Sequence, residues 1–177
     1  QIKHQKGITD QKRGALFSKL LSAIAVAARG EPNPNFNSRL RTAILKAKAS
    51  NIPQENIERA IRRAEDKSQA LEEIIMEAYG PGSAAILIDA ITDNKNRTVA
   101  EIKKILADNG GKWADAGSVL WGFEKNQSST ENLWTAKFCQ TVNESDLIKL
   151  KALTTALANQ PDVQKIFTNV SFGSESK

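Results

Sequence analysis

The sequence predicts an α+β protein: an N-terminal three-helix domain followed by a ferredoxin-like split βαβ sandwich. Apolar residues recur at helical spacing through residues 14–64, and from Leu71 the period becomes strand-like. Strand-like and helix-like segments then alternate in the order β, βαβ, βαβ. Since such crossovers are right-handed, both helices should cover one face of one sheet, to which the first strand is an addition. We expect domains at residues 1–70 and 71–177.

The first domain contains three amphipathic segments. The helix expected at residues 14–29 has apolar residues at four-residue intervals and ends at Gly30, before two prolines that cannot continue it. A second helix should begin near Asn37 or Ser38, since either side chain can accept a backbone N–H bond. Pro53 suits the first turn of a third helix.

In the second domain, two short apolar runs flank Gly80, Pro81 and Gly82, as in a hairpin. Thr98 and Glu101 form the Thr-x-x-Glu pattern of a capping box, which predicts a helix beginning there. The polar segment 126–132 joins the two halves of this domain. The expected strands are 72–80, 83–92, 118–125, 131–142 and 163–172, and the expected helices are 98–111 and 144–162.

The glycines around Pro81 do not form a phosphate-binding loop. Such a loop joins a strand to the N-terminus of a helix, whereas these glycines join a strand to a strand, and no GK[ST] follows. We interpret the segment as a structural turn in which glycine accepts positive φ.

Positive charge is concentrated in the first domain. Residues 1–70 hold 14 Lys and Arg against 6 Asp and Glu, a net charge of +8, whereas the remainder holds 11 against 14, a net charge of −3. Intrahelical ion pairs cannot absorb this excess, although a solvated helical surface is the simpler interpretation. The asymmetry favours a polyanionic partner such as nucleic acid.

Five potentially cationic residues lie in the first thirteen positions: Lys3, His4, Lys6, Lys12 and Arg13. The segment 2–14 is either a frayed solubilising end or an arm that neutralises phosphates. No base-reading motif such as a zinc finger is present, which favours recognition of nucleic-acid shape and backbone.

Other chemistry has little support. One cysteine and one histidine exclude an intramolecular disulfide and a Cys/His zinc site, so we expect no metal and no cofactor. Cys139 is expected to be a small buried strand residue. No apolar stretch is long enough to span a bilayer, so we expect no membrane partner.

Two further sets of residues leave alternatives open. The carboxylates Glu77, Asp89, Asp93 and Glu101 do not exclude an acid–base pair, but Asp93 and Asn94 suit local bonds in a strand-to-helix turn. The indoles of Trp113, Trp121 and Trp134 suit base stacking, although the strand positions of Trp121 and Trp134 favour the core.

Several segments resemble the YebC family, which has a mitochondrial branch known as the translational activator of cytochrome c oxidase. They are IKHQK, KRGALFSKL, AVAARGEPNPNFNSRLRTAILKAKASNIPQENIERAI, YGPGSAAILIDAITDNKNRT, and NGG followed by GSVLWGFEK. The resemblance implies a helical domain and two α/β domains, the third inserted within the second. Here the chain passes directly through 126–132, so the inserted domain is expected to be either absent or not represented in this chain, and the family's N-terminal lead is expected to be missing before Ile2.

The resemblance also implies a function. Family members are described as DNA-binding transcriptional regulators and as ribosome-associated factors that support elongation through difficult sequences, including proline-rich ones. It implies a non-enzymatic, monomeric factor in the cytoplasm, or alternatively the mitochondrial matrix, that binds the ribosome and its ribosomal RNA, with DNA as the alternative. The nucleic-acid-binding candidates are Lys3, His4, Lys6, Lys12, Arg13, Arg39, Arg41, Lys46 and Lys48.

Overall fold

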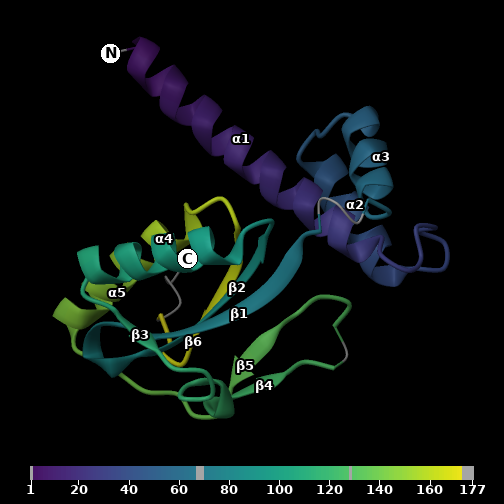
Figure 1. The fold of residues 1–177 in the computed structure, drawn as a ribbon. Coiled ribbons are helices and arrows are strands. Elements are labelled where there is room, and N and C mark those ends of the chain that lie inside the picture. Colours follow the sequence, from purple (N-terminus) through teal and green to yellow (C-terminus); the bar gives the residue numbers. More distant parts are fainter. Residues whose placement is uncertain (1, 67–69, 128, 173–177) are drawn as a thin grey trace, which may run out of the picture. The chain divides into compact units, whose positions relative to one another are not determined.

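The computed structural model describes residues 2–66, 70–127 and 129–172, and of residues 2–9 only the backbone. Its helices and strands are shown in Figure 1: α1 (Ile2–Ala27), α2 (Ser38–Ala49), α3 (Gln54–Arg63), β1 (Glu72–Tyr79), β2 (Ala85–Thr92), α4 (Lys95–Asp108), β3 (Lys112–Ala114), β4 (Phe123–Lys125), β5 (Trp134–Ala136), α5 (Glu144–Ala158) and β6 (Val163–Thr168). The chain divides into two compact units, one formed by residues 1–73 and 91–95 and the other by residues 74–90 and 96–177.

In the first unit, α2 and α3 pack against the C-terminal half of α1 (Figure 1). The core is formed by Ile24, Leu40 and Ile57, which are at most 1% exposed, together with smaller side chains. Asn37 is the N-cap of α2, as expected, because its side chain accepts a 2.9 Å hydrogen bond from the backbone N–H of Leu40. Its amide group also donates to the carbonyl of Ala27, which fixes α2 against the end of α1.

Within the described residues of the second unit, four strands form a sheet in the order β3-β1-β2-β6. β3 pairs antiparallel with β1, and β6 pairs antiparallel with β2. Helix α4 crosses from β2 to β3, which lie on either side of β1. This arrangement is a split βαβ unit, so the predicted α+β class, with a helical N-terminal part and a split βαβ sandwich, is confirmed.

Three of the predicted strands have other roles than expected. β1 is not an addition to the sheet but lies in its centre, because the hairpin pairs it with β2 and leaves its other edge for β3. The segments 118–125 and 131–142 form only the short strands β4 and β5, which pair with each other in a separate sheet. The length of a strand-like segment in the sequence does not reveal which other strand it will pair with.

Strand β2 is covered on both faces, which explains why every residue from Ile86 to Ala90 is buried. One face packs against α4 and α5, through side chains that include Ile102 and Leu153. The opposite face, at Leu87, packs against Val119 and Phe123 near the β4–β5 hairpin. Figure 1 shows the helices and the hairpin on opposite sides of the sheet.

The glycine turn between β1 and β2 has the predicted structural role. The backbone N–H of Gly80 donates to the carbonyl of Ala84 at 2.8 Å, which closes the turn. Gly82 has a φ of 70°, and a Cβ there would lie 2.6 Å from Cγ1 of Val142. Both its conformation and its surroundings therefore require glycine.

The predicted capping box was wrong. Helix α4 begins at Lys95, and Thr98 is fully buried inside it. The Thr98 hydroxyl donates a 2.7 Å hydrogen bond to Asp162, just before β6, and Glu101 accepts one from Gln160. The two side chains that the local pattern assigned to a helix cap therefore form hydrogen bonds with residues that are distant in the sequence.

The turn before α4 contains the expected kind of local bond. The hydroxyl of Thr92 accepts the backbone N–H of Asn94 at 2.9 Å.

Candidate nucleic-acid interface

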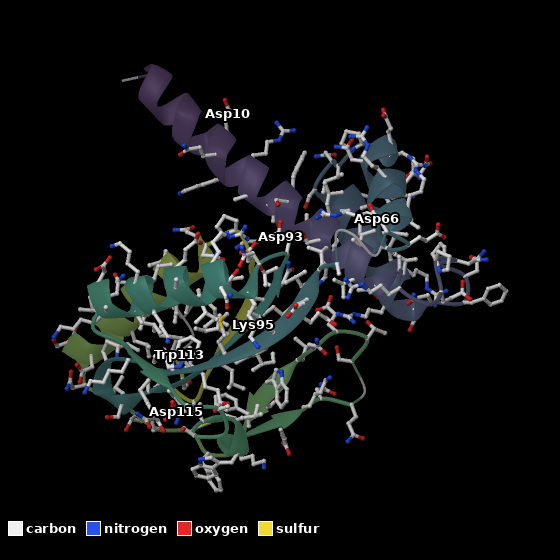
Figure 2. All side chains as sticks on the ribbon, in the orientation of Figure 1. Asp10, Asp66, Asp93, Lys95, Trp113 and Asp115 are labelled. Carbon is white, nitrogen blue, oxygen red and sulfur yellow. The ribbon has the colours of Figure 1, made fainter. Side chains whose placement is uncertain are left out.

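The exposed surface of α1 begins with a stretch that is open to solvent all round. Every residue from Asp10 to Gly14 is exposed, whereas burial becomes continuous from Ile24 to Ala28. Asp10 is labelled on this first part of the helix in Figure 2. Five consecutive positions cover every direction around a helix, so no described part of the first unit covers this segment.

Lys12 and Arg13 lie on this exposed part of α1. The guanidinium carbon of Arg13 is 5.4 Å from the centre of the Phe17 ring, a cation–π contact that orients the side chain while leaving its charge accessible. Farther along, burial lowers the pKa of Lys19 from its ordinary value, because it disfavours the charged form.

The predicted arm at residues 2–14 was expected to precede the first helix, but α1 is continuous from Ile2. Its beginning lacks an apolar stripe, which is why periodicity alone placed the start at Gly14. The backbone of Lys3, His4 and Lys6 is part of α1, and their side chains lie outside the described part of the structure.

The candidate cations of α2 divide into two pairs. The two members of each pair are seven residues apart in the sequence. At 3.6 residues per turn, this spacing places them on the same side of the helix. Arg39 and Lys46 flank the buried Leu40 on one side, and Arg41 and Lys48 flank it on the other. The pairs therefore face different directions, and the candidate residues do not form one continuous surface.

Arg39 also has an internal partner. Its guanidinium forms an ion pair with the carboxylate of Glu73, and the two side chains are 39% and 33% exposed. Part of its charge is thus neutralised within the first unit. Lys46 and Lys48 instead lie in the last turn of α2, where the helix dipole favours cations.

A second basic surface was missed by the sequence reasoning. A groove of about 540 Å³ lies along α3 and is lined by Leu21, Asn56, Arg59, Ala60, Arg62, Arg63 and Asp66. The polar members recur at spacings of three and four residues, a signal that was visible in the sequence. The spacing alone did not predict a groove, because nothing in the sequence indicated that α1 would contribute Leu21 as an opposing wall.

The predicted aromatic positions were only partly right. Trp121 was expected in the core but is 66% exposed, with its ring centre 6.2 Å from that of the exposed Phe138. It belongs to a short 3₁₀ turn rather than to a strand, so the alternation that would bury it does not apply. Trp134 is partly buried against the core, and Trp113 is partly buried beneath the ammonium group of Lys103.

Cys139 was predicted to be a buried strand residue, but it is exposed. Strand β5 ends at Ala136, so the cysteine lies beyond the pairing that would have covered it.

The buried carboxylate of Glu77 has a structural environment. It accepts hydrogen bonds from the backbone N–H groups of Gly117, Val119 and Leu120 at 2.6, 2.7 and 2.8 Å. These bonds hold the loop before β4 against the sheet and provide no proton-transfer partner. In the described part of the chain, no group of three or more His, Cys, Asp or Glu side chains is placed to hold a metal ion.

The fold and charge distribution define an α+β protein with a basic, helical N-terminal unit. Two family models match this chain: the TACO1/YebC protein N-terminal domain over residues 1–67, and the TACO1/YebC second and third domain over residues 71–128. Together they cover more than half of its length. The chain belongs to the TACO1/YebC family, which confirms the predicted resemblance.

Bacterial relatives support this assignment. A probable transcriptional regulatory protein of Chloroflexus aurantiacus is 47% identical over 156 residues, which are 86% of this chain and 60% of the relative. A protein of the same name from Pseudothermotoga lettingae is 53% identical over 127 residues, which are 70% of this chain and 50% of the relative. The chain thus spans only about half to three fifths of these relatives.

A solved structure has the same fold. The crystal structure of the conserved hypothetical protein Aq1575 from Aquifex aeolicus matches with a TM-score of 0.82 and 30% identity, over 94% of each chain. No helix in the described ranges is both long and apolar enough to cross a membrane.

Proposed function

We propose that this protein is a ribosome-associated translation factor whose basic helical unit binds ribosomal RNA. The observation that carries the proposal is the exposed basic segment of α1, within a region whose net charge is +8. A cationic helical segment that is not covered by the rest of its own unit can approach a phosphate backbone from any side. Supporting elongation through difficult sequences, including proline-rich ones, is the role that family membership favours.

The proposed contacts fall into two groups. The first is on α1 and comprises Lys3, His4, Lys6, Lys12 and Arg13. The second is on α2 and comprises Arg39, Arg41, Lys46 and Lys48. Because the α2 cations face two directions, we expect only one of their pairs to contact the same RNA strand as α1. Arg39 should contribute least, since binding must compete with Glu73.

The two predicted domains would have different tasks. Residues 1–70 would dock the factor through phosphate contacts, and residues 71–177 would serve as a spacer or a contact surface near the functional centre of the ribosome. This mechanism is positioning and requires no catalytic residue, cofactor or second copy. The bacterial relatives favour the cytoplasm over the mitochondrial matrix.

Co-sedimentation with ribosomes tests this proposal. Replacing Lys3, Lys6, Lys12 and Arg13 by alanine should release most of the protein into the supernatant at physiological salt, because several phosphate contacts are lost together. The matched control replaces the same number of cations, Lys112, Lys125, Lys149 and Lys151, which are exposed in the second unit. Equal recovery of wild type and the α1 variant would contradict the role of α1.

A DNA-binding transcriptional regulator is the second candidate, favoured by the names of the bacterial relatives. It predicts an operator that outcompetes bulk DNA at physiological salt. Weak binding that falls uniformly with salt for every DNA sequence would leave only general polyanion affinity. Ribosome profiling after deletion separates the candidates, because a translation factor predicts pausing at particular codons.

A further inference from the structure

The groove along α3, here called the arginine groove, is a concave surface with a strong excess of positive charge. Its lining residues, named above, include the guanidinium groups of Arg59, Arg62 and Arg63 against the carboxylate of Asp66. None of these arginines belongs to the nucleic-acid-binding candidates proposed on α1 and α2. Asp66, labelled in Figure 2, follows the C-terminal end of α3 and marks one end of the groove.

Internal ion pairing leaves much of this charge available. Arg59 forms a 2.8 Å ion pair with Glu55, but the two side chains are 68% and 75% exposed, so the pair is weak and easily exchanged. The Nε atom of Arg63 is buried and has no hydrogen-bond partner among the described residues. A guanidinium held in this way is partly desolvated, which makes a nearby anion more favourable than it would be in open solvent.

We propose that the arginine groove binds two successive phosphates of a nucleic-acid strand. This inference rests on the proposed function, to which it adds a second contact site on a different helix. Arg59 and Arg63 are one helical turn apart, which corresponds to a rise of about 6 Å along α3. That rise is close to the distance between neighbouring phosphates of one strand, so each guanidinium meets its own phosphate.

The groove's other residues suit the same ligand. Guanidinium groups bind phosphate oxygens in a bidentate manner, with more geometric specificity than lysine ammonium groups. Leu21 and Ala60 supply an apolar wall that limits water around these contacts. The amide of Asn56 suits a sugar hydroxyl or a phosphate oxygen at one end, whereas Asp66 repels phosphate and ends the track at the other.

Binding of a labelled single-stranded RNA of about twelve nucleotides to the whole chain, measured by fluorescence anisotropy between about 50 and 200 mM salt, tests the groove. The test variant is Arg59→Gln/Arg62→Gln/Arg63→Gln. The control, Lys112→Gln/Lys149→Gln/Lys151→Gln, removes the same charge from exposed positions of the second unit. Far-UV circular dichroism and urea unfolding verify that each variant is folded.

We expect the groove variant to bind at least tenfold more weakly, with a log–log salt slope smaller in magnitude by about 1.4, since each lost single-strand phosphate contact removes about 0.7. The control should retain the wild-type slope. If the glutamine variant does not fold, Arg59→Lys/Arg63→Lys replaces it. That variant keeps the positive charge but loses the bidentate geometry of the guanidinium groups. It should therefore retain the wild-type salt slope and bind RNA severalfold more weakly.

Further probes identify the chemistry that is bound. DNA of the same sequence should lose affinity in the groove variant by the same factor, because the phosphate is shared. Equal wild-type binding of an RNA with neutral methylphosphonate linkages would overturn the inference, as would equally strong competition by polyglutamate. If wild type binds RNA and the groove variant binds it with the same slope, the groove inference fails while the proposed function stands. If wild type binds no RNA, the proposed function itself fails.

Discussion

The buried carboxylate of Glu77 fixes the loop that leads to β4 by accepting several backbone N–H groups. Glu77→Gln keeps the shape but replaces one acceptor oxygen by an NH₂ group that faces those donors. Losing charge-assisted bonds and leaving buried N–H groups unsatisfied should lower the free energy of unfolding by about 2–3 kcal/mol. Urea unfolding followed by tryptophan fluorescence measures this change.

Glu124→Gln is the matched control, because Glu124 is exposed on the short strand β4. Its effect should stay within about 0.5 kcal/mol. If Glu77→Gln were equally mild, the carboxylate would not be what holds the loop.

Single residues also show where sequence reasoning succeeds and fails. Asn37 was predictable as a cap because its partner lies three residues away. The roles of Thr98 and Glu77 were not, since their partners are 64 residues and at least 40 residues distant along the chain. Local sequence patterns predict hydrogen bonds between residues that are close in the chain. A bond to a distant residue forms only when folding brings the two residues together, so such patterns do not predict it.

At the scale of elements, Asp162 joins the beginning of β6 to α4. Its carboxylate accepts hydrogen bonds from the hydroxyl of Thr98 and from Arg97, at 2.7 and 2.9 Å. Burial alone would raise the pKa of Asp162, but the hydrogen bonds from Thr98, Arg97 and Gln160, with the charge of Arg97, outweigh it and hold the pKa below its ordinary value. The folded state therefore favours the charged carboxylate.

This carboxylate should make part of the protein's stability acid-sensitive. Since folding lowers its pKa, its contribution is complete above the unfolded pKa of about 4 and is lost as the pH falls through the lower, folded value. Asp162→Asn should reduce the urea midpoint at pH 7, and the difference from wild type should shrink as the pH approaches about 3. A difference that is the same at both pH values would show that the charge of Asp162 does not stabilise the contact.

Element types were mostly predictable, whereas their pairing was not. The apolar periodicities of α2, α3 and α5 and the hairpin of β1 and β2 identified those segments correctly. The beginning of α1 lacks such a pattern, and β4 and β5 are short strands that pair outside the main sheet. Strand order depends on which edges remain available after the first hairpin forms, and one strand's sequence does not contain that information.

At the scale of the whole molecule, charge asymmetry predicted the basic unit but not the geometry of its surface. The proposed cations of α1 and α2 were found by counting residues. The arginine groove could be recognised only from the structure, because it forms where α3 packs beside Leu21 of α1. Leu21 is the wall opposite the arginines of α3. The proposed polyanion site was therefore predictable as a property of residues 1–70, whereas the proposed division of its contacts among three helices was not.

The central claim is that the first unit, through α1 and the arginine groove, is the surface that binds nucleic acid. Amide hydrogen exchange of the whole chain, measured with and without ribosomes, tests it most directly, because protection reports which backbone segments become covered or more stable. The account predicts slower exchange in peptides covering residues 2–15 and 54–66, with little change in α5. Protection confined to α5 and β6, with unchanged exchange throughout residues 2–66, would contradict it.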